Sequence, residues 1–164
     1  MPRNFIANWA KLPVLAVTSL VAAVIALTSV SREAMAAVNC LPVNGHLKEQ
    51  QVPCPSLCTT GRMNGGIQGT YNFTLTSLSP VDPAIPTVVH FSGLTTITTQ
   101  DGDLNIIDAG GFDTASPGNF ANLMTIVGGT GALTGASGHL FLFGDFDPAM
   151  GTGASDYRGE VCIP

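Results

Sequence analysis

A glycine-rich segment, residues 126–138, constrains the fold of this chain more than any other feature. It carries no charge and joins two apolar runs, residues 120–127 and 139–146. Glycine reaches positive φ angles and lets a chain bend sharply where a β-barrel closes. The segment therefore predicts a corner between two strands, with Leu133 pointing into the interior. The residues that define this structural motif are Gly128, Gly129, Gly131, Leu133, Gly135 and Gly138.

The same glycines do not fit a phosphate-binding loop. A Walker loop has lysine and then serine or threonine after its last glycine, whereas Gly135 is followed by Ala136 and Ser137. The dinucleotide-binding motif needs glycine or alanine where this chain has Thr134, and it must open a helix. Nucleotide binding is therefore not expected.

The first 36 residues have the features of an export signal. Arg3 and Lys11 precede an uncharged, mostly apolar run over residues 12–30, and Ala34 and Ala36 provide the small residues of a cleavage site. The apolar run is also long enough for an uncleaved membrane anchor. Cleavage is the favoured interpretation, and it predicts a secreted or periplasmic protein without stable membrane insertion.

The chain that follows the signal is acidic. Its only lysines and arginines are Lys48, Arg62 and Arg158, against ten carboxylates. Nucleic-acid binding requires lysine and arginine to neutralise phosphates, so a nucleic-acid partner is excluded.

Four cysteines, Cys40, Cys54, Cys58 and Cys162, follow the predicted signal. An even number of cysteines in an exported chain indicates disulfides, and three pairings are possible. No second tight pair of cysteine or histidine accompanies Cys54 and Cys58, which disfavours zinc. We expect Cys162 to bridge to an N-terminal cysteine, a closure worth about 4–5 kcal/mol in the chain-entropy model.

Period-two alternation of apolar and polar residues predicts a series of strands. Residues 37–66 show little periodicity and are expected to form an irregular arm tied by disulfides, so that the barrel domain comprises residues 67–164. Frequent turn signals separate the strands, and short connections favour up-and-down antiparallel order. The predicted strands are residues 67–76, 87–99, 104–108, 120–127, 139–146 and 154–162.

Residues 87–162 resemble the allene oxide cyclase and dirigent-like β-barrel superfamily, in the manner of uncharacterised bacterial members. The resemblance rests on the run Val127-Gly128-Gly129-Thr130-Gly131, on Leu133 and on the small-residue end Gly135-Ala136-Ser137-Gly138, with further similar elements at residues 102–104, 108–110 and 159–162. It implies an antiparallel, eight-stranded barrel with an apolar interior that often assembles as a homo-oligomer. Ser137 stands where dirigent sequences usually have arginine, so the plant activities do not follow from the motif.

Candidate ligand-contacting residues come from the inward faces of the predicted strands. Tyr71, Phe73, Val89 and Phe91 form an apolar stripe suited to a cavity lining, since an eight-stranded barrel either fills its interior or holds one small ligand. Asp108 interrupts an otherwise apolar strand, and burial would raise its pKa.

No metal or cofactor site is predicted. Asp101 and Asp103 begin like a calcium loop, but Ile106 and Phe112 occupy the positions that require glycine and glutamate. His46, His90 and His139 show no spacing typical of a metal site.

The leading hypothesis is a non-catalytic exported barrel that binds an apolar small molecule or has an extracytoplasmic structural role. The alternative is a cyclase-like isomerase or dirigent-type protein that guides cyclisation or radical coupling of a lipid or phenolic substrate. An open cavity beside Tyr71 or Asp108 would favour the alternative. A barrel filled by Phe73, Phe91, Leu133 and Phe141 would exclude ligand binding and catalysis alike.

Overall fold

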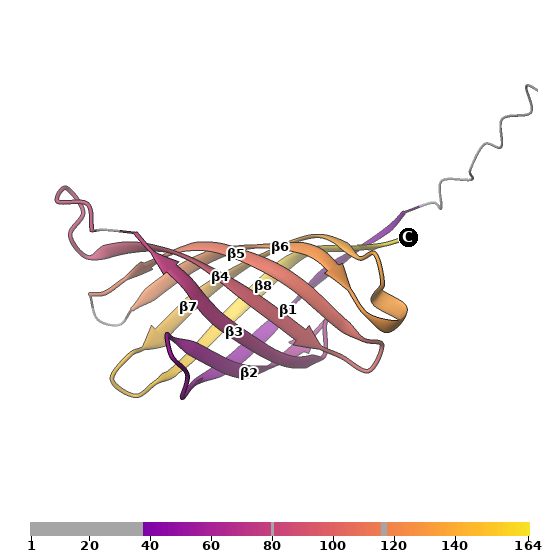
Figure 1. Ribbon diagram of the computed structural model, residues 1–164, viewed down its shortest axis with the longest axis horizontal. Coiled ribbons are helices and arrows are strands. Elements are labelled where there is room, and N and C mark those ends of the chain that lie inside the picture. Colours follow the sequence, from indigo (N-terminus) through magenta and orange to yellow (C-terminus); the bar gives the residue numbers. More distant parts are fainter. Residues whose placement is uncertain (1–37, 80, 116–117) are drawn as a thin grey trace, which may run out of the picture. The chain divides into compact units, whose positions relative to one another are not determined.

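The computed structural model describes residues 38–79, 81–115 and 118–164, so the predicted export signal lies outside the described residues. Eight antiparallel strands form a closed barrel in which each strand pairs with the next and β8 pairs with β1 (Figure 1). The predicted all-β, up-and-down architecture is therefore confirmed. The strands are β1 Asn39–Val52, β2 Cys58–Gly65, β3 Gly69–Leu78, β4 Val88–Thr98, β5 Asp103–Asp113, β6 Asn119–Gly129, β7 Ser137–Asp147 and β8 Thr152–Ile163.

The prediction of an irregular N-terminal arm is wrong, because most of residues 37–66 form β1 and β2. β1 closes the barrel by pairing with β2 on one side and β8 on the other. Its inward positions include Gly45 and Glu49 beside Leu47, so the contrast between its two faces is weak in the sequence. The barrel therefore begins at Asn39 rather than at residue 67.

β5 is longer than the predicted strand at residues 104–108. Gly110 and Gly111 lie beyond the end of the predicted strand, but both are part of β5. A Cβ atom at Gly110 would lie 2.6 Å from the carbonyl oxygen of Ala121 and would meet the ring of Phe91, with Cζ as the nearest atom and Cε1 at 2.8 Å. This glycine leaves room for an aromatic ring inside the barrel.

The glycine-rich segment forms the predicted corner between β6 and β7. A short 3-10 turn, η1 (Gly131–Leu133), lies at the end of the barrel that also holds the C-terminus (Figure 1). Gly131 has φ +59° and Gly138 has φ +124°, values that side-chain-bearing residues rarely adopt. Leu133 is half-buried and packs against the core, while Ala136 is the buried residue of the corner.

The part of the barrel nearest η1 is filled with apolar side chains. The hydroxyl group of Tyr157 closes this region: it accepts a hydrogen bond from the backbone nitrogen of Ile67 at 2.8 Å and lies 3.1 Å from the carbonyl oxygen of Asn64. The core residues with almost no exposure include Leu47, Met63, Ile97, Leu104, Ile106, Met124, Leu140 and Leu142.

Two disulfides join the four cysteines. Cys40 of β1 lies opposite Cys162 of β8 and is bonded to it, which confirms the expected link between the N-terminal region and the last strand. The second disulfide joins Cys54 and Cys58 in the connection between β1 and β2. Disulfides persist in oxidising compartments, so the pair indicates an extracytoplasmic environment. Within the described residues, helical structure long and apolar enough to cross a membrane is not found.

Candidate ligand site in the open half of the barrel

The half of the barrel away from η1 contains a cavity of about 500 Å³. The strand ends farthest from the filled core form the walls of the cavity, and Leu78, Thr114 and Pro148 lie at its mouth. This volume lies within the range of small-molecule pockets. The remaining lining residues are Glu49, Gln51, Leu57, Thr59, Tyr71, Phe73, Leu75, Val89, Phe91, Phe112, Phe120, Asn122 and Phe146.

The aromatic wall of the cavity depends on glycines in the neighbouring strands. The rings of Phe73 and Phe91 meet edge to face, with centroids 6.0 Å apart and planes at 81°. Each ring covers a glycine, Gly93 beneath Phe73 and Gly110 beneath Phe91. The structure therefore places the predicted stripe of Tyr71, Phe73, Val89 and Phe91 on a cavity, and ligand contact by these residues stays a prediction.

Glu49 of β1 and Thr59 of β2 bring polar groups to the inner end of this apolar cavity. The Thr59 hydroxyl donates a hydrogen bond of 2.6 Å to Oε2 of Glu49. Burial raises the pKa of Glu49, and the hydrogen bond from Thr59 opposes that rise only in part.

A second polar pair lies on β5 and β6. Nδ2 of Asn122 donates a hydrogen bond of 2.6 Å to Oδ1 of Asp108. Asp108 is 0% exposed, and burial raises its pKa to about 6 despite this hydrogen bond. The predicted inward orientation of Asp108 is confirmed, but Asp108 lies behind Asn122, which is the member of the pair that lines the cavity.

Tyr71 of β3 completes this polar region and is 2% exposed. Burial raises the pKa of its phenol well above the ordinary value, and the negative charges of Glu49 and then Asp108 raise it further. Tyr71 therefore keeps its proton at neutral pH, so its hydroxyl is able to donate a hydrogen bond. We call Glu49, Thr59, Tyr71, Asn122 and Asp108 the polar floor.

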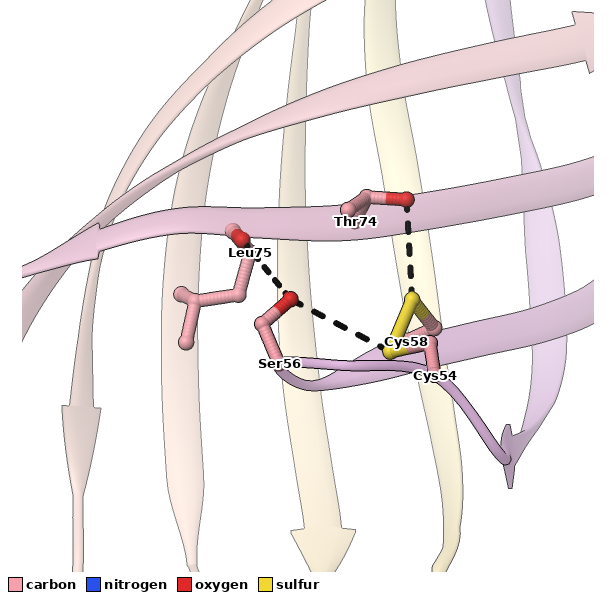
Figure 2. The surroundings of a disulfide bond; sticks show 5 residues. All are labelled: Cys54, Ser56, Cys58, Thr74 and Leu75. Carbon is pink, nitrogen blue, oxygen red and sulfur yellow. Dashed lines mark hydrogen bonds between the residues drawn. A yellow bond between two sulfur atoms is a disulfide. The ribbon is translucent and has the colours of Figure 1, made fainter.

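The Cys54–Cys58 disulfide fixes one side of the cavity. Between the two cysteines, Ser56 donates a hydrogen bond of 3.0 Å to the carbonyl oxygen of Leu75 (Figure 2). The backbone nitrogen of Leu75 in turn donates a hydrogen bond of 2.9 Å to the carbonyl oxygen of Leu57. The hydroxyl of Thr74 also lies 3.6 Å from the sulfur of Cys58. Because Leu57 and Leu75 line the cavity, the disulfide holds the β1–β2 connection against this wall.

The other chemistry-bearing residues lie away from the cavity. His46, His90 and His139 are exposed on the barrel surface, and the sulfur atoms of Cys40 and Cys162, although near Glu160, are joined in a disulfide. Phe141 is also on the outer surface, so it does not fill the barrel.

Three floor residues were missed by the sequence analysis. Glu49 and Thr59 lie in the region expected to be irregular. Asn122 could have been predicted from the sequence, because it interrupts the apolar inward face of β6 between Phe120 and Met124, as Asp108 does in β5.

Comparison with known proteins adds no family assignment: no family model matches the chain, and searches of curated proteins and of solved structures give no match. The assignment of a closed eight-stranded barrel therefore rests on the strand pairing alone. The resemblance to the cyclase and dirigent-like superfamily remains a prediction.

Proposed function

We propose that this protein binds an apolar small molecule in the open half of its barrel without transforming it. The observation that carries the proposal is the cavity of about 500 Å³, with apolar and aromatic walls and a few polar groups at one end. Small-molecule sites typically combine such walls with a small number of polar groups that orient the ligand.

We further propose that the protein works outside the cytoplasm, as a secreted or periplasmic protein. The export signal expected over residues 1–36 and the two disulfides support this location independently.

The test is to block the cavity and measure binding of n-octanol by isothermal titration calorimetry. Leu75→Trp places a large ring in the cavity wall, and Thr98→Trp is the control because Thr98 is exposed on the outer face of β4. We expect binding to the unmodified protein and to Thr98→Trp, and its loss in Leu75→Trp. Equal binding by both variants would contradict the cavity as the site.

A second candidate is a cyclase-like or dirigent-type activity on a lipid or phenolic substrate. The observation that favours it is Tyr71, a protonated phenol that lines the cavity close to the carboxylate of Glu49. A phenol donor and a buried carboxylate are groups that can orient a substrate or move a proton during an isomerisation, and such a reaction needs no cofactor.

The second candidate predicts a stereochemical effect that depends on Tyr71. A phenol oxidised by an added one-electron oxidant, and separately a lipid epoxide, are incubated with the protein, and the product enantiomers are separated by chiral chromatography. Enantiomeric excess that is lost in Tyr71→Phe would support this activity. Racemic products from both substrates, together with retained octanol binding, would refute the second candidate and support non-catalytic binding.

We also propose that the barrel forms a homo-oligomer. Exposed apolar side chains gather on the outer faces of neighbouring strands, where Leu94 pairs with Ile107 and Leu123 pairs with Phe141. Contiguous apolar surface of this kind is typical of association sites. Native mass spectrometry should show an oligomer that Leu123→Glu disrupts and Thr70→Glu, on the outer face of β3, does not; a monomer at all concentrations would refute it.

A further inference from the structure

The two buried atoms of the polar floor that lack a hydrogen-bond partner among the described residues are both acceptors. Because the carboxylate of Asp108 can only accept, Asn122 must direct Nδ2 toward it, which leaves Oδ1 of Asn122 buried without a partner among residues 38–79, 81–115 and 118–164. Oδ2 of Asp108 is likewise buried without a hydrogen-bond partner among the described residues, and so is the hydroxyl of Thr95, a donor whose proximity lowers the pKa of Asp108. Glu49 adds a carboxylate that, within the part of the chain that the structure describes, accepts a side-chain hydrogen bond from Thr59 alone.

Unpaired buried acceptors are costly, so the floor is complementary to a group that donates hydrogen bonds. A buried acceptor without a donor has lost its hydrogen bonds to water and gained none in the protein. Asn122 is 2% exposed and lines the cavity, so a molecule bound at the inner end lies against its side chain.

The charges around the cavity have a single sign. Glu49 is the charged residue in its lining, and within the described residues no lysine, arginine or histidine lines it. At the open end, Asp82 lies in the β3–β4 connection and Asp113 and Asp147 end β5 and β7, and the described residues of these connections include no lysine or arginine. The side chains of Lys48, Arg62 and Arg158 are exposed, away from the cavity.

We propose that the ligand is an apolar amine whose protonated amino group lies on the polar floor, beside Glu49 and the free oxygen of Asn122. This inference rests on the proposed ligand-binding function and names the chemical class of the ligand. The apolar part of the molecule fills the cavity between the aromatic wall and the mouth.

The chemistry of the head group separates the three simplest ligand classes. An ammonium group donates three hydrogen bonds and carries the charge that Glu49 and Asp108 lack as a partner. A hydroxyl group donates one hydrogen bond and brings no charge. A carboxylate donates none and places a third negative charge in a desolvated space, which is unfavourable.

The test compares n-octylamine, n-octanol and octanoate, which share one alkyl chain, by isothermal titration calorimetry at neutral pH. We expect the amine to bind at least about tenfold more tightly than the alcohol, since hydrogen bonds to charged groups exceed neutral ones, and octanoate to bind most weakly. Octanoate or octanol binding as tightly as the amine would overturn the inference while leaving the binding function intact. Absence of binding for all three ligands would overturn the binding function itself.

Charge-removing variants locate the amino group. Glu49→Gln removes the floor carboxylate, and Glu160→Gln removes the same charge from the outer surface of β8. We expect Glu49→Gln to lose about tenfold in amine affinity while keeping octanol affinity, and Glu160→Gln to change neither. An amine preference that survives Glu49→Gln undiminished would place the amino group elsewhere and refute the assignment. The ligand series on the unmodified protein decides the question even if Glu49→Gln fails to fold.

Discussion

The two disulfides of this barrel should differ strongly in their contributions to stability. Cys40 and Cys162 are 122 residues apart in sequence and join the strands at which the barrel closes. Cys54 and Cys58 are only 4 residues apart and close a tight connection at the open end. The perturbation is the removal of one disulfide at a time, as Cys40→Ala with Cys162→Ala, and as Cys54→Ala with Cys58→Ala.

The expected magnitudes follow from the entropy that each bond removes from the unfolded chain. The chain-entropy model gives about 5 kcal/mol for a loop of the longer length and about 2 kcal/mol for the shorter one. The long-range pair should therefore lower the free energy of unfolding by about 3 kcal/mol more than the short-range pair.

Urea unfolding followed by far-ultraviolet circular dichroism measures both losses. The control is the same comparison with excess reductant, where no disulfide remains and the three proteins should unfold at similar urea concentrations. Equal losses under oxidising conditions, or a larger loss for the short-range pair, would refute the chain-entropy reasoning. A difference that persists after reduction would assign it to side-chain contacts instead.

Three further perturbations test the interior. Burial raises the pKa of Asp108 from 3.8 to about 6, so the folded protein keeps this proton between those pH values and the free energy of unfolding falls as the pH rises through them. Asp108→Asn should reduce that fall by about 3 kcal/mol in urea titrations, and an unchanged pH profile would contradict the assignment. Tyr157→Phe leaves the buried backbone nitrogen of Ile67 without its acceptor and should lower the free energy of unfolding by about 1–3 kcal/mol. An unshifted urea midpoint would contradict this contribution of the Tyr157 hydroxyl. Gly93→Ala forces a methyl group into an aromatic ring of the cavity wall and should lower the free energy of unfolding by about 1–3 kcal/mol. A Cβ atom at Gly111 meets nothing closer than 3.6 Å, so Gly111→Ala should be neutral. Equal urea midpoints for the two variants would show that the ring moves aside without cost.

The sequence predicted six of the eight strands, because their inward faces alternate clearly with polar outward faces. β3 is an example, since Tyr71 and Phe73 point inward while Asn72 and Thr74 are exposed. β1 and β2 were missed because their inward positions combine glycine, threonine and glutamate with few large apolar residues, which removes the contrast on which period-two analysis depends.

The candidate site was predicted in part. The aromatic stripe and Asp108 were recognised as inward-facing residues, and the structure places the stripe on the cavity and Asp108 behind it. Glu49 and Thr59 were not recognised, because a polar residue in a segment without visible periodicity looks like an ordinary solvent-exposed residue. Their positions became apparent only when β1 and β2 took their places in the barrel.

The sequence by itself determined the strand class, the corner at residues 126–138 and the disulfide-forming character of the chain, because these depend on local properties: alternation, positive φ at glycine and cysteine content. Only the tertiary structure decided that one half of the barrel is filled and the other half open. That division depends on which side chains meet across closed strands, since Leu47, Ile97 and Leu104 fill one end while Phe73 and Phe91 lie against glycines at the other. The gathering of Glu49 and Asn122 on one cavity floor has the same cause, because residues far apart in sequence become neighbours only when β1 closes against β8.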